Sequence, residues 1–301
     1  MDAPKHLIGT AGLVIRSMRP RQWIKNLFVF APILFSMNIF QPSHLLRASA
    51  AFLLFCALAG VVYLINDIVD RGEDRHHPVK RHRPLASGLL RVNTALFWAA
   101  AIALCSLLVS WVFSKAFFWT ALTYMAINIA YSLWLKAVVI LDVMLISAGF
   151  VLRVMAGGFA NDIPLSPWIL LITFLLSIFL ALVKRRQEMM RSQMSEEGGS
   201  RSRAILDKYN LPFLDQLIAL STATTLISYF MYVLDPRVKG KFHTDWLIVT
   251  IPFVVFGVFR YLFLAYVDNR GENPEEVVIT DLPFLINALL WLAVFVWILY
   301  A

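Results

Sequence analysis

The stretch that decides the fold lies at residues 45–74 and reads LLRASAAFLLFCALAGVVYLINDIVDRGED. Its first part is an apolar run of about 20 residues, which is long enough for a helix to cross a bilayer. The run ends in amide and acidic side chains, at Asn66, Asp67, Asp70 and Asp74. Such groups are costly at the end of a membrane helix and are commonly functional there. The stretch therefore predicts a membrane helix that ends in a functional site.

The chain as a whole is unusually apolar. Of its 301 residues, 59% are hydrophobic and 15% are charged, whereas soluble domains contain about 45–50% apolar and about 25% charged residues. A soluble domain could not bury so much apolar surface, and the same composition excludes a disordered chain. Because the apolar runs are long and unbroken, we expect spanning helices rather than barrel strands. Cys56 and Cys105 each lie in such a run and are expected to be plain membrane-core side chains.

Nine apolar runs approach the length that a spanning helix needs. We therefore expect an all-α polytopic membrane protein with nine transmembrane helices, forming a single transmembrane domain over residues 1–301. The first run is the weakest, because Pro32 interrupts it. The runs lie at residues 24–40, 45–66, 93–113, 117–135, 138–158, 165–183, 214–234, 245–267 and 282–300.

Lys and Arg residues are concentrated on one side of this topology. Most of them lie in the N-terminal stretch and in the even-numbered loops, above all in the loops at about 67–92 and 184–213. By the positive-inside rule this side faces the cytoplasm, so we expect an inner (cytoplasmic) membrane protein with these catalytic loops and its N-terminus inside. The net charge of +8 fits the lipid bilayer surface or an anionic substrate. No nucleic acid partner is expected, and the sequence does not decide between a monomer and a homo-oligomer.

The acidic end of the second run has the spacing of a metal site. Asn66, Asp70 and Asp74 follow one another at i, i+4 and i+8, which places them on one face of a helix at about 100° per residue. Hard oxygen ligands suit Mg²⁺, which is usually shared with substrate phosphates. These three residues are therefore the candidate catalytic and metal-ligating residues, with Mg²⁺ as cofactor. Asp67 points away from this face, although it could meet Asp70 or Asp74. The alternative is a solvated acidic helix end neutralised by arginines.

A basic loop follows directly, with the sequence HHPVKRHRPLASG at residues 76–88. Lys80 and Arg83 are candidates for neutralising substrate phosphates, because Arg binds phosphate oxygens through two donors. The alternative is a loop that sets topology and touches anionic lipid. The histidines of this loop lack a second cluster of soft ligands, which argues against zinc.

The segment from Asn66 to Gly88 resembles the first aspartate-rich motif of the UbiA superfamily of intramembrane prenyltransferases, Asn-Asp-x-x-Asp-x-x-x-Asp followed by a basic loop. The resemblance implies nine helices around a central, lipid-facing cavity. The prenyltransferases of that superfamily carry a second motif, Asp-x-x-x-Asp, after the sixth helix, where this chain has KRRQE at residues 184–188. One acidic and one basic cluster would suit a substrate with a pyrophosphate at one end and a phosphate at the other, such as phosphoribosyl pyrophosphate.

Three further stretches resemble the branch of the superfamily that contains the decaprenyl-phosphate phosphoribosyltransferases. They run from Tyr131 to Asp142, from Gly149 to Gly158, and from Asn273 to Asp281. This resemblance implies a Mg-dependent membrane glycosyltransferase that transfers 5-phosphoribosyl from phosphoribosyl pyrophosphate to a polyprenyl (decaprenyl-type) phosphate and releases pyrophosphate. The candidate substrate-binding residues are Lys80, Arg83, Tyr131, Lys136, Asp142, Arg153, Lys184, Arg185 and Glu188.

Several of these candidates also have purely structural interpretations. Residues 184–186 could be a positive-inside anchor, and the acidic loop at 275–276 could be solvated surface. Asp142 and Arg153 are eleven residues apart and nearly on one helix face, so they could form an ion pair or hydrogen bond within the helix. For Tyr131 and Lys136, the sequence favours neither a structural role nor a substrate-binding role over the other.

Two other functions compete with the phosphoribosyl transfer. One is a prenyltransferase that moves a prenyl chain from prenyl diphosphate to an aromatic or lipid acceptor, with Glu188 replacing part of the missing motif. The other is an anion transporter, for which we would expect paired broken helices and inverted repeats. The sequence contains neither feature in recognisable form.

Overall fold

The computed structural model describes residues 9–194, 208–268 and 274–300, and these ranges contain helices and no strand. Within them, eight helical elements are long and apolar enough to cross a membrane. They are α3 (Pro42–Val69), α5 (Val92–Phe113), α6 (Lys115–Leu133), α7 (Leu141–Ala160), α8 (Pro167–Met194), α9 (Leu211–Leu234), α11 (Ile251–Tyr266) extended backwards by η5 (Trp246–Thr250), and α13 (Leu282–Tyr300). The all-α membrane fold is thus confirmed, and eight of the nine predicted spans are found as helices.

The first predicted span, at 24–40, does not form a continuous spanning helix, so the count of nine is not confirmed. The chain there forms a 3₁₀ segment, η1 (Pro20–Phe30), and a short helix, α2 (Ala31–Phe35). Pro32 is in the first turn of α2, where its missing N–H does not cost a hydrogen bond. The prolines therefore divide this segment into two pieces, and η1 packs against α3 and α7.

Gly157 allows η1 to approach α7 closely. A Cβ atom at position 157 would lie 1.9 Å from the backbone carbonyl oxygen of Val29, which is itself fully buried. One turn earlier on α7, Arg153 Nε donates a hydrogen bond to Asn26 Oδ1 of η1 at 2.7 Å. The irregular segment is therefore fixed by tertiary contacts rather than by its own helical propensity.

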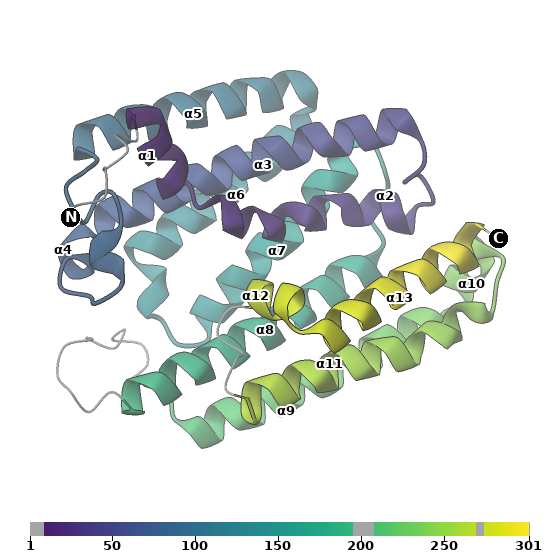
Figure 1. Ribbon diagram of the computed structural model, residues 1–301. Coiled ribbons are helices and arrows are strands. Elements are labelled where there is room, and N and C mark those ends of the chain that lie inside the picture. Colours follow the sequence, from purple (N-terminus) through teal and green to yellow (C-terminus); the bar gives the residue numbers. More distant parts are fainter. Residues whose placement is uncertain (1–8, 195–207, 269–273, 301) are drawn as a thin grey trace, which may run out of the picture.

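The helices form two packed groups (Figure 1). One apolar core lies among α1 (Thr10–Ser17), η1, α3, α5, α6 and α7, and a second lies among the start of α7, α8, α9 and α11. Helix α7 contacts α8 and so joins the groups. Many apolar side chains point outward, and only 11% of the apolar window of α13 is buried, which is the surface expected of a protein surrounded by lipid.

The two charged segments lie at the same end of the bundle. The short helix α4 (Arg71–Asp74) follows α3 there, together with η2 (Lys80–His82), and the carboxyl-terminal end of α8 lies at the same end, on the left in Figure 1. The carboxyl terminus of α13 and α10 (Pro236–Phe242) lie at the opposite end, and α12 (Pro274–Thr280) precedes α13. Residues 184–194, expected in a loop, continue α8 as helix. The tip of that loop, at 195–200, lies outside the described residues.

The close approach at Gly157 predicts a steep cost for a single methyl group. Gly157→Ala should lower the free energy of unfolding by about 1–3 kcal/mol, because the clash is with backbone and η1 must move away from α7. Thermal unfolding of the detergent-purified protein measures this effect. Gly240→Ala on α10 is the control, because a Cβ there meets no atom within 4 Å. Equal melting temperatures for the two variants would contradict the packing described.

Candidate active site

The acidic cluster, consisting of Asn66, Asp67, Asp70 and Asp74, lies at the junction of α3 and α4. The chain turns at Asp70, which separates the two helices. The backbone N–H groups of Asp70 and Asp74 still donate to the carbonyl oxygens four residues earlier, at 2.8 and 2.9 Å. The predicted i, i+4, i+8 spacing therefore survives in the backbone, although the side chains find different partners.

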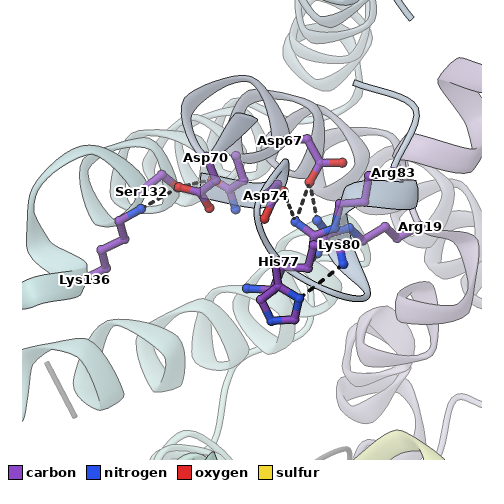
Figure 2. A network of polar contacts seen from close by, with 10 residues as sticks. Arg19, Asp67, Asp70, Asp74, His77, Lys80, Arg83, Ser132 and Lys136 are labelled. Atoms are coloured by element: carbon purple, nitrogen blue, oxygen red, sulfur yellow. Dashed lines mark hydrogen bonds and ion pairs between the residues drawn. The ribbon is translucent and has the colours of Figure 1, made fainter. Parts of the chain in front are cut away.

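Two arginines neutralise the buried half of this cluster (Figure 2). Arg83 Nη1 lies 2.6 Å from Asp74 Oδ2 and 3.3 Å from Asp67 Oδ1, so that one guanidinium bridges two carboxylates. Arg19 forms a second ion pair with Asp67 and stacks on the ring of Tyr63. Asp67 and Asp74 are only 2% and 3% exposed. Asp67, expected to point away from the metal face, therefore shares a cation with Asp74.

The other half of the cluster contacts the end of α6. Lys136 Nζ, in the 3₁₀ turn η3 (Leu135–Ala137), lies 2.7 Å from Asp70 Oδ1. The hydroxyl of Ser132 donates to Asn66 Oδ1. In Figure 2, Lys136 and Ser132 approach the cluster from the side opposite to Arg19 and Arg83. The predicted ligands Asn66, Asp70 and Asp74 thus each have a separate protein partner.

The donor set of this cluster fits a hard divalent cation by its chemistry. It offers carboxylate and amide oxygens within nine residues of chain, and the Asp70 side chain is 32% exposed. In the described ranges, no group of three or more His, Cys, Asp and Glu side chains is arranged to hold a metal ion. Arg19, Arg83 and Lys136 provide the positive charge around these oxygens instead.

The basic loop is folded back against α4. Arg71 and Arg75 donate through Nε to the backbone carbonyls of Leu85 and Ala86, at 3.2 and 3.4 Å. Within the loop, the backbone N–H groups of Val79 and Lys80 donate to Nδ1 of His77, and Figure 2 shows the contact with Lys80. Burial and the nearby Lys80 charge lower the pKa of His77. A neutral His77 can accept these bonds, so it shapes the loop that carries Lys80 and Arg83.

The second group of charged residues, the α8 cluster, consists of Asp142, Arg185 and Glu188. Arg185 Nε lies 2.7 Å from Asp142 Oδ2, and Nη1 contacts Glu188. Its Nη2 donates to the hydroxyl of Tyr131 at the end of α6, at 3.1 Å. Arg185 is 2% exposed and Asp142 is fully buried. Arg185, a predicted phosphate ligand, therefore has its charge compensated by two carboxylates.

Arg186 is also neutralised within the protein. Its Nε lies 2.7 Å from Asp215 Oδ1 on α9, and its guanidinium stacks on the ring of Tyr266 at 3.9 Å. Within the KRRQE segment, Arg185 thus pairs with Asp142 and Glu188, and Arg186 pairs with Asp215. Both arginines of the expected basic cluster are compensated by carboxylates, and Lys184 and Arg186 are its partly exposed members.

Asp142 and Arg153 do not pair with each other, contrary to the structural alternative considered for them. Asp142 faces α8, whereas Arg153 lies about 16 Å further along α7. Arg153 donates to Asn26, to the carbonyl oxygen of Gly149 and to the hydroxyl of Tyr124. Among the described residues all its partners are uncharged. The structure therefore gives Arg153 a role in fixing η1 and does not bring it to the α8 cluster.

The end of α6 connects the acidic cluster with the α8 cluster. Adjacent residues face opposite ways: Tyr131 contacts Arg185, and Ser132 contacts Asn66. Lys136, one turn later, contacts Asp70. Tyr131 and Lys136 were predicted from the sequence, whereas Ser132, Arg19 and Tyr209 were not. The hydroxyl of Tyr209 donates to Asp142 Oδ1 at 3.0 Å. Arg19 was counted only as a topology charge, and no local signal marked the other two.

Two apolar hollows in the described surface lie away from these clusters. One, of about 490 Å³, is lined by residues of α5 with Arg47 and Ala160, and the other, of about 610 Å³, lies between α9 and α11. Neither is lined by residues of the acidic cluster or the α8 cluster. The central cavity between the two clusters therefore stays a prediction.

Comparison with known proteins gives a consistent result. A family model described as the UbiA prenyltransferase family matches residues 27–273. A protein of Mycolicibacterium smegmatis named decaprenyl-phosphate phosphoribosyltransferase is 35% identical over 96% of this chain and 92% of its own length. A protein of the same name from Corynebacterium glutamicum is 32% identical over 99% of this chain and 89% of its own length. The structure of a UbiA homolog from Archaeoglobus fulgidus bound to DMAPP and Mg²⁺ has a TM-score of 0.70 at 19% identity, covering 95% of this chain and 98% of that one.

The buried ion pair at Asp142 predicts a large loss of stability on substitution. Asp142→Asn should lower the free energy of unfolding by about 3 kcal/mol, because it leaves Arg185 with Glu188 as its single acidic partner in a buried place. The control is Asp162→Asn, since Asp162 pairs with Arg47 at 3.1 Å on the exposed surface, where a pair contributes less than about 1 kcal/mol. Denaturant titration in detergent measures both values. Equal losses would show that Asp142 is not in a buried ion pair.

Proposed function

Because the chain belongs to the UbiA prenyltransferase family, we propose that it transfers 5-phosphoribosyl from phosphoribosyl pyrophosphate to a polyprenyl phosphate of the decaprenyl type, with release of pyrophosphate. The names of its relatives support decaprenyl phosphate as the acceptor and a phosphoribosyl group as the group transferred. The observation that carries the proposal is the difference in charge between the acidic cluster and residues 184–188. The acidic cluster is rich in oxygen donors, whereas the segment after the sixth predicted span contains Glu188 and three cations in place of a second pair of aspartates.

We assign the pyrophosphate end of the donor to the acidic cluster. Asn66, Asp70 and Asp74 would hold Mg²⁺, which would neutralise the leaving pyrophosphate. Arg83 and Lys80 bind the remaining pyrophosphate oxygens, because both lie on the loop folded against α4. Arg83 already bridges Asp67 and Asp74, so its guanidinium is held at the position where the leaving charge develops.

The transfer exchanges one bond at the anomeric carbon of the ribose. The bond to the pyrophosphate oxygen breaks, and an oxygen of the polyprenyl phosphate bonds to the same carbon from the opposite side, which inverts its configuration. Carboxylate oxygens of the acidic cluster stabilise the oxocarbenium-like carbon in the transition state. A phosphate monoester is already anionic near neutral pH, so the attack needs no strong base.

We assign the phosphate ends of the substrates to Lys136 and Lys184. Lys136 lies between the two clusters in sequence and contacts Asp70, and Lys184 is a partly exposed cation of α8. Tyr131 and Glu188 both contact Arg185, which also pairs with Asp142, and we assign these three residues to the same part of the site. Arg185 and Arg153 are too buried to bind substrate in this conformation, and we assign them to holding α8, α6 and η1 in place.

The chain is a multi-pass membrane protein. We propose that the end of the bundle with α4 and the end of α8 faces the cytoplasm, since Lys and Arg are concentrated there. Phosphoribosyl pyrophosphate, a soluble anion, would then reach the site from the cytoplasm, and the polyprenyl phosphate would reach it from the membrane. The protein would form a single transmembrane domain with the two loops around 67–92 and 184–213 on that side.

The proposal is tested by following a label from each candidate donor. The purified protein with Mg²⁺ and decaprenyl phosphate should move ribose label from phosphoribosyl pyrophosphate into the lipid fraction and release one pyrophosphate per transfer. Labelled prenyl diphosphate with an aromatic acceptor should give no product. Prenyl transfer without ribose transfer would contradict the proposal and favour the prenyltransferase alternative.

Single substitutions test whether the transfer activity depends on the acidic cluster. Asp70→Asn should reduce the transfer rate at least about a hundredfold, because it removes a carboxylate that would hold the Mg²⁺ on the leaving pyrophosphate. Asp245→Asn, at an exposed ion pair with Lys239, is the control with the same change of charge. Wild-type rates in both variants would refute the assignment of the acidic cluster.

A further inference from the structure

The corner between η3 and α7 contains a strained residue. Ile140 has φ +69° and ψ −45°, a conformation that is uncommon for any residue except glycine and especially for a β-branched one. Such a conformation persists only where the surrounding structure holds it. At Ile140 a hydrogen bond does so, because its backbone N–H donates to the hydroxyl oxygen of Tyr209 at 2.8 Å.

The hydroxyl of Tyr209 makes a second bond within the same corner. It donates to Asp142 Oδ1 at 3.0 Å, while the other oxygen of that carboxylate accepts from Arg185. Tyr209 is buried just before α9, and burial raises the pKa of Tyr209 to about 12, so the hydroxyl remains a donor at neutral pH. The hydroxyl oxygen of Tyr209 thus connects the segment before α9 with the backbone at Ile140 and with the carboxylate of Asp142 at the start of α7.

The corner that Tyr209 holds carries one residue that contacts the acidic cluster and one member of the α8 cluster. Lys136 lies four residues before Ile140 and contacts Asp70 of the acidic cluster. Asp142 lies two residues after it and contacts Arg185, which in turn contacts Tyr131. A change in the backbone at Ile140 would therefore shift the cation beside the acidic cluster and the ion pair of the α8 cluster together.

We propose that Tyr209 is a positioning residue, whose hydroxyl fixes the η3–α7 corner and thereby sets the relative placement of Lys136 and Asp142. This inference rests on the proposed function, because it concerns the binding of phosphoribosyl pyrophosphate between the two clusters. Tyr209 acts through Ile140 and Asp142 and does not touch the substrate. Without the hydroxyl, the Ile140 N–H and one oxygen of Asp142 lose their partner, and the corner relaxes away from its strained conformation.

The experiment compares two Tyr→Phe variants in the full-length protein in detergent. Tyr209→Phe removes the hydroxyl with both of its hydrogen bonds. Tyr232→Phe, on α9, removes a buried hydroxyl that has no hydrogen-bond partner among the described residues. Equilibrium binding of phosphoribosyl pyrophosphate with Mg²⁺ is measured at a temperature well below the melting temperature of every variant, so that loss of folded protein does not enter the result.

We expect the dissociation constant of Tyr209→Phe to rise at least about threefold, the factor that corresponds to one ordinary hydrogen bond, while Tyr232→Phe binds like the wild type. A lower melting temperature of Tyr209→Phe with unchanged binding would show that the hydroxyl only stabilises the fold and would overturn the inference. Wild-type protein that binds no phosphoribosyl pyrophosphate would overturn the proposed function and this inference with it.

Discussion

The arrangement around the site depends on the neutralisation of the carboxylates at the end of α3. Asp67 and Asp74 are buried next to the membrane-spanning part of the chain, where an unpaired charge is very costly. Arg83 reaches both of them only because the loop after α4 folds back, and Arg19 reaches Asp67 only because the N-terminal segment lies beside α3. The irregular segment η1 and the basic loop are thus both tied to the acidic cluster.

The end of α6 and η3 together connect the acidic cluster with the α8 cluster. Within residues 131–136, at the end of α6 and in η3, the chain offers a hydroxyl to Asn66, a phenol oxygen to Arg185 and an ammonium group to Asp70. These contacts involve residues of both packed groups of helices. The two groups otherwise contact each other mainly through α7 and α8. A donor molecule bound between the clusters would contact residues from both groups, so its binding would depend on how this junction is held.

The sequence predicted the spanning helices well because apolar length is a local property. It predicted a ninth span at 24–40, although Pro32 interrupts that run, and it gave no sign of the close approach of η1 to Gly157, which depends on a distant helix. The members of the acidic cluster were also predictable, since their spacing lies within one segment. Partners from distant segments were not predictable: one of the two interpretations of Asp142 paired it with Arg153 on its own helix, whereas the structure pairs it with Arg185 on α8. The KRRQE segment was interpreted as a basic cluster for the same reason, because Asp142 and Asp215, which neutralise two of its cations, lie elsewhere in the chain.

The central claim is that the acidic cluster and the residues at the ends of α6 and α8 bind one substrate between them. A structure of the protein in nanodiscs with phosphoribosyl pyrophosphate and Mn²⁺ tests it most directly, because the anomalous or density signal of the metal locates the pyrophosphate. We expect Mn²⁺ beside Asp70 and the 5-phosphate of the same molecule beside Lys136 or Lys184. Metal and sugar phosphate found at another place, or a donor whose 5-phosphate contacts neither lysine, would contradict it.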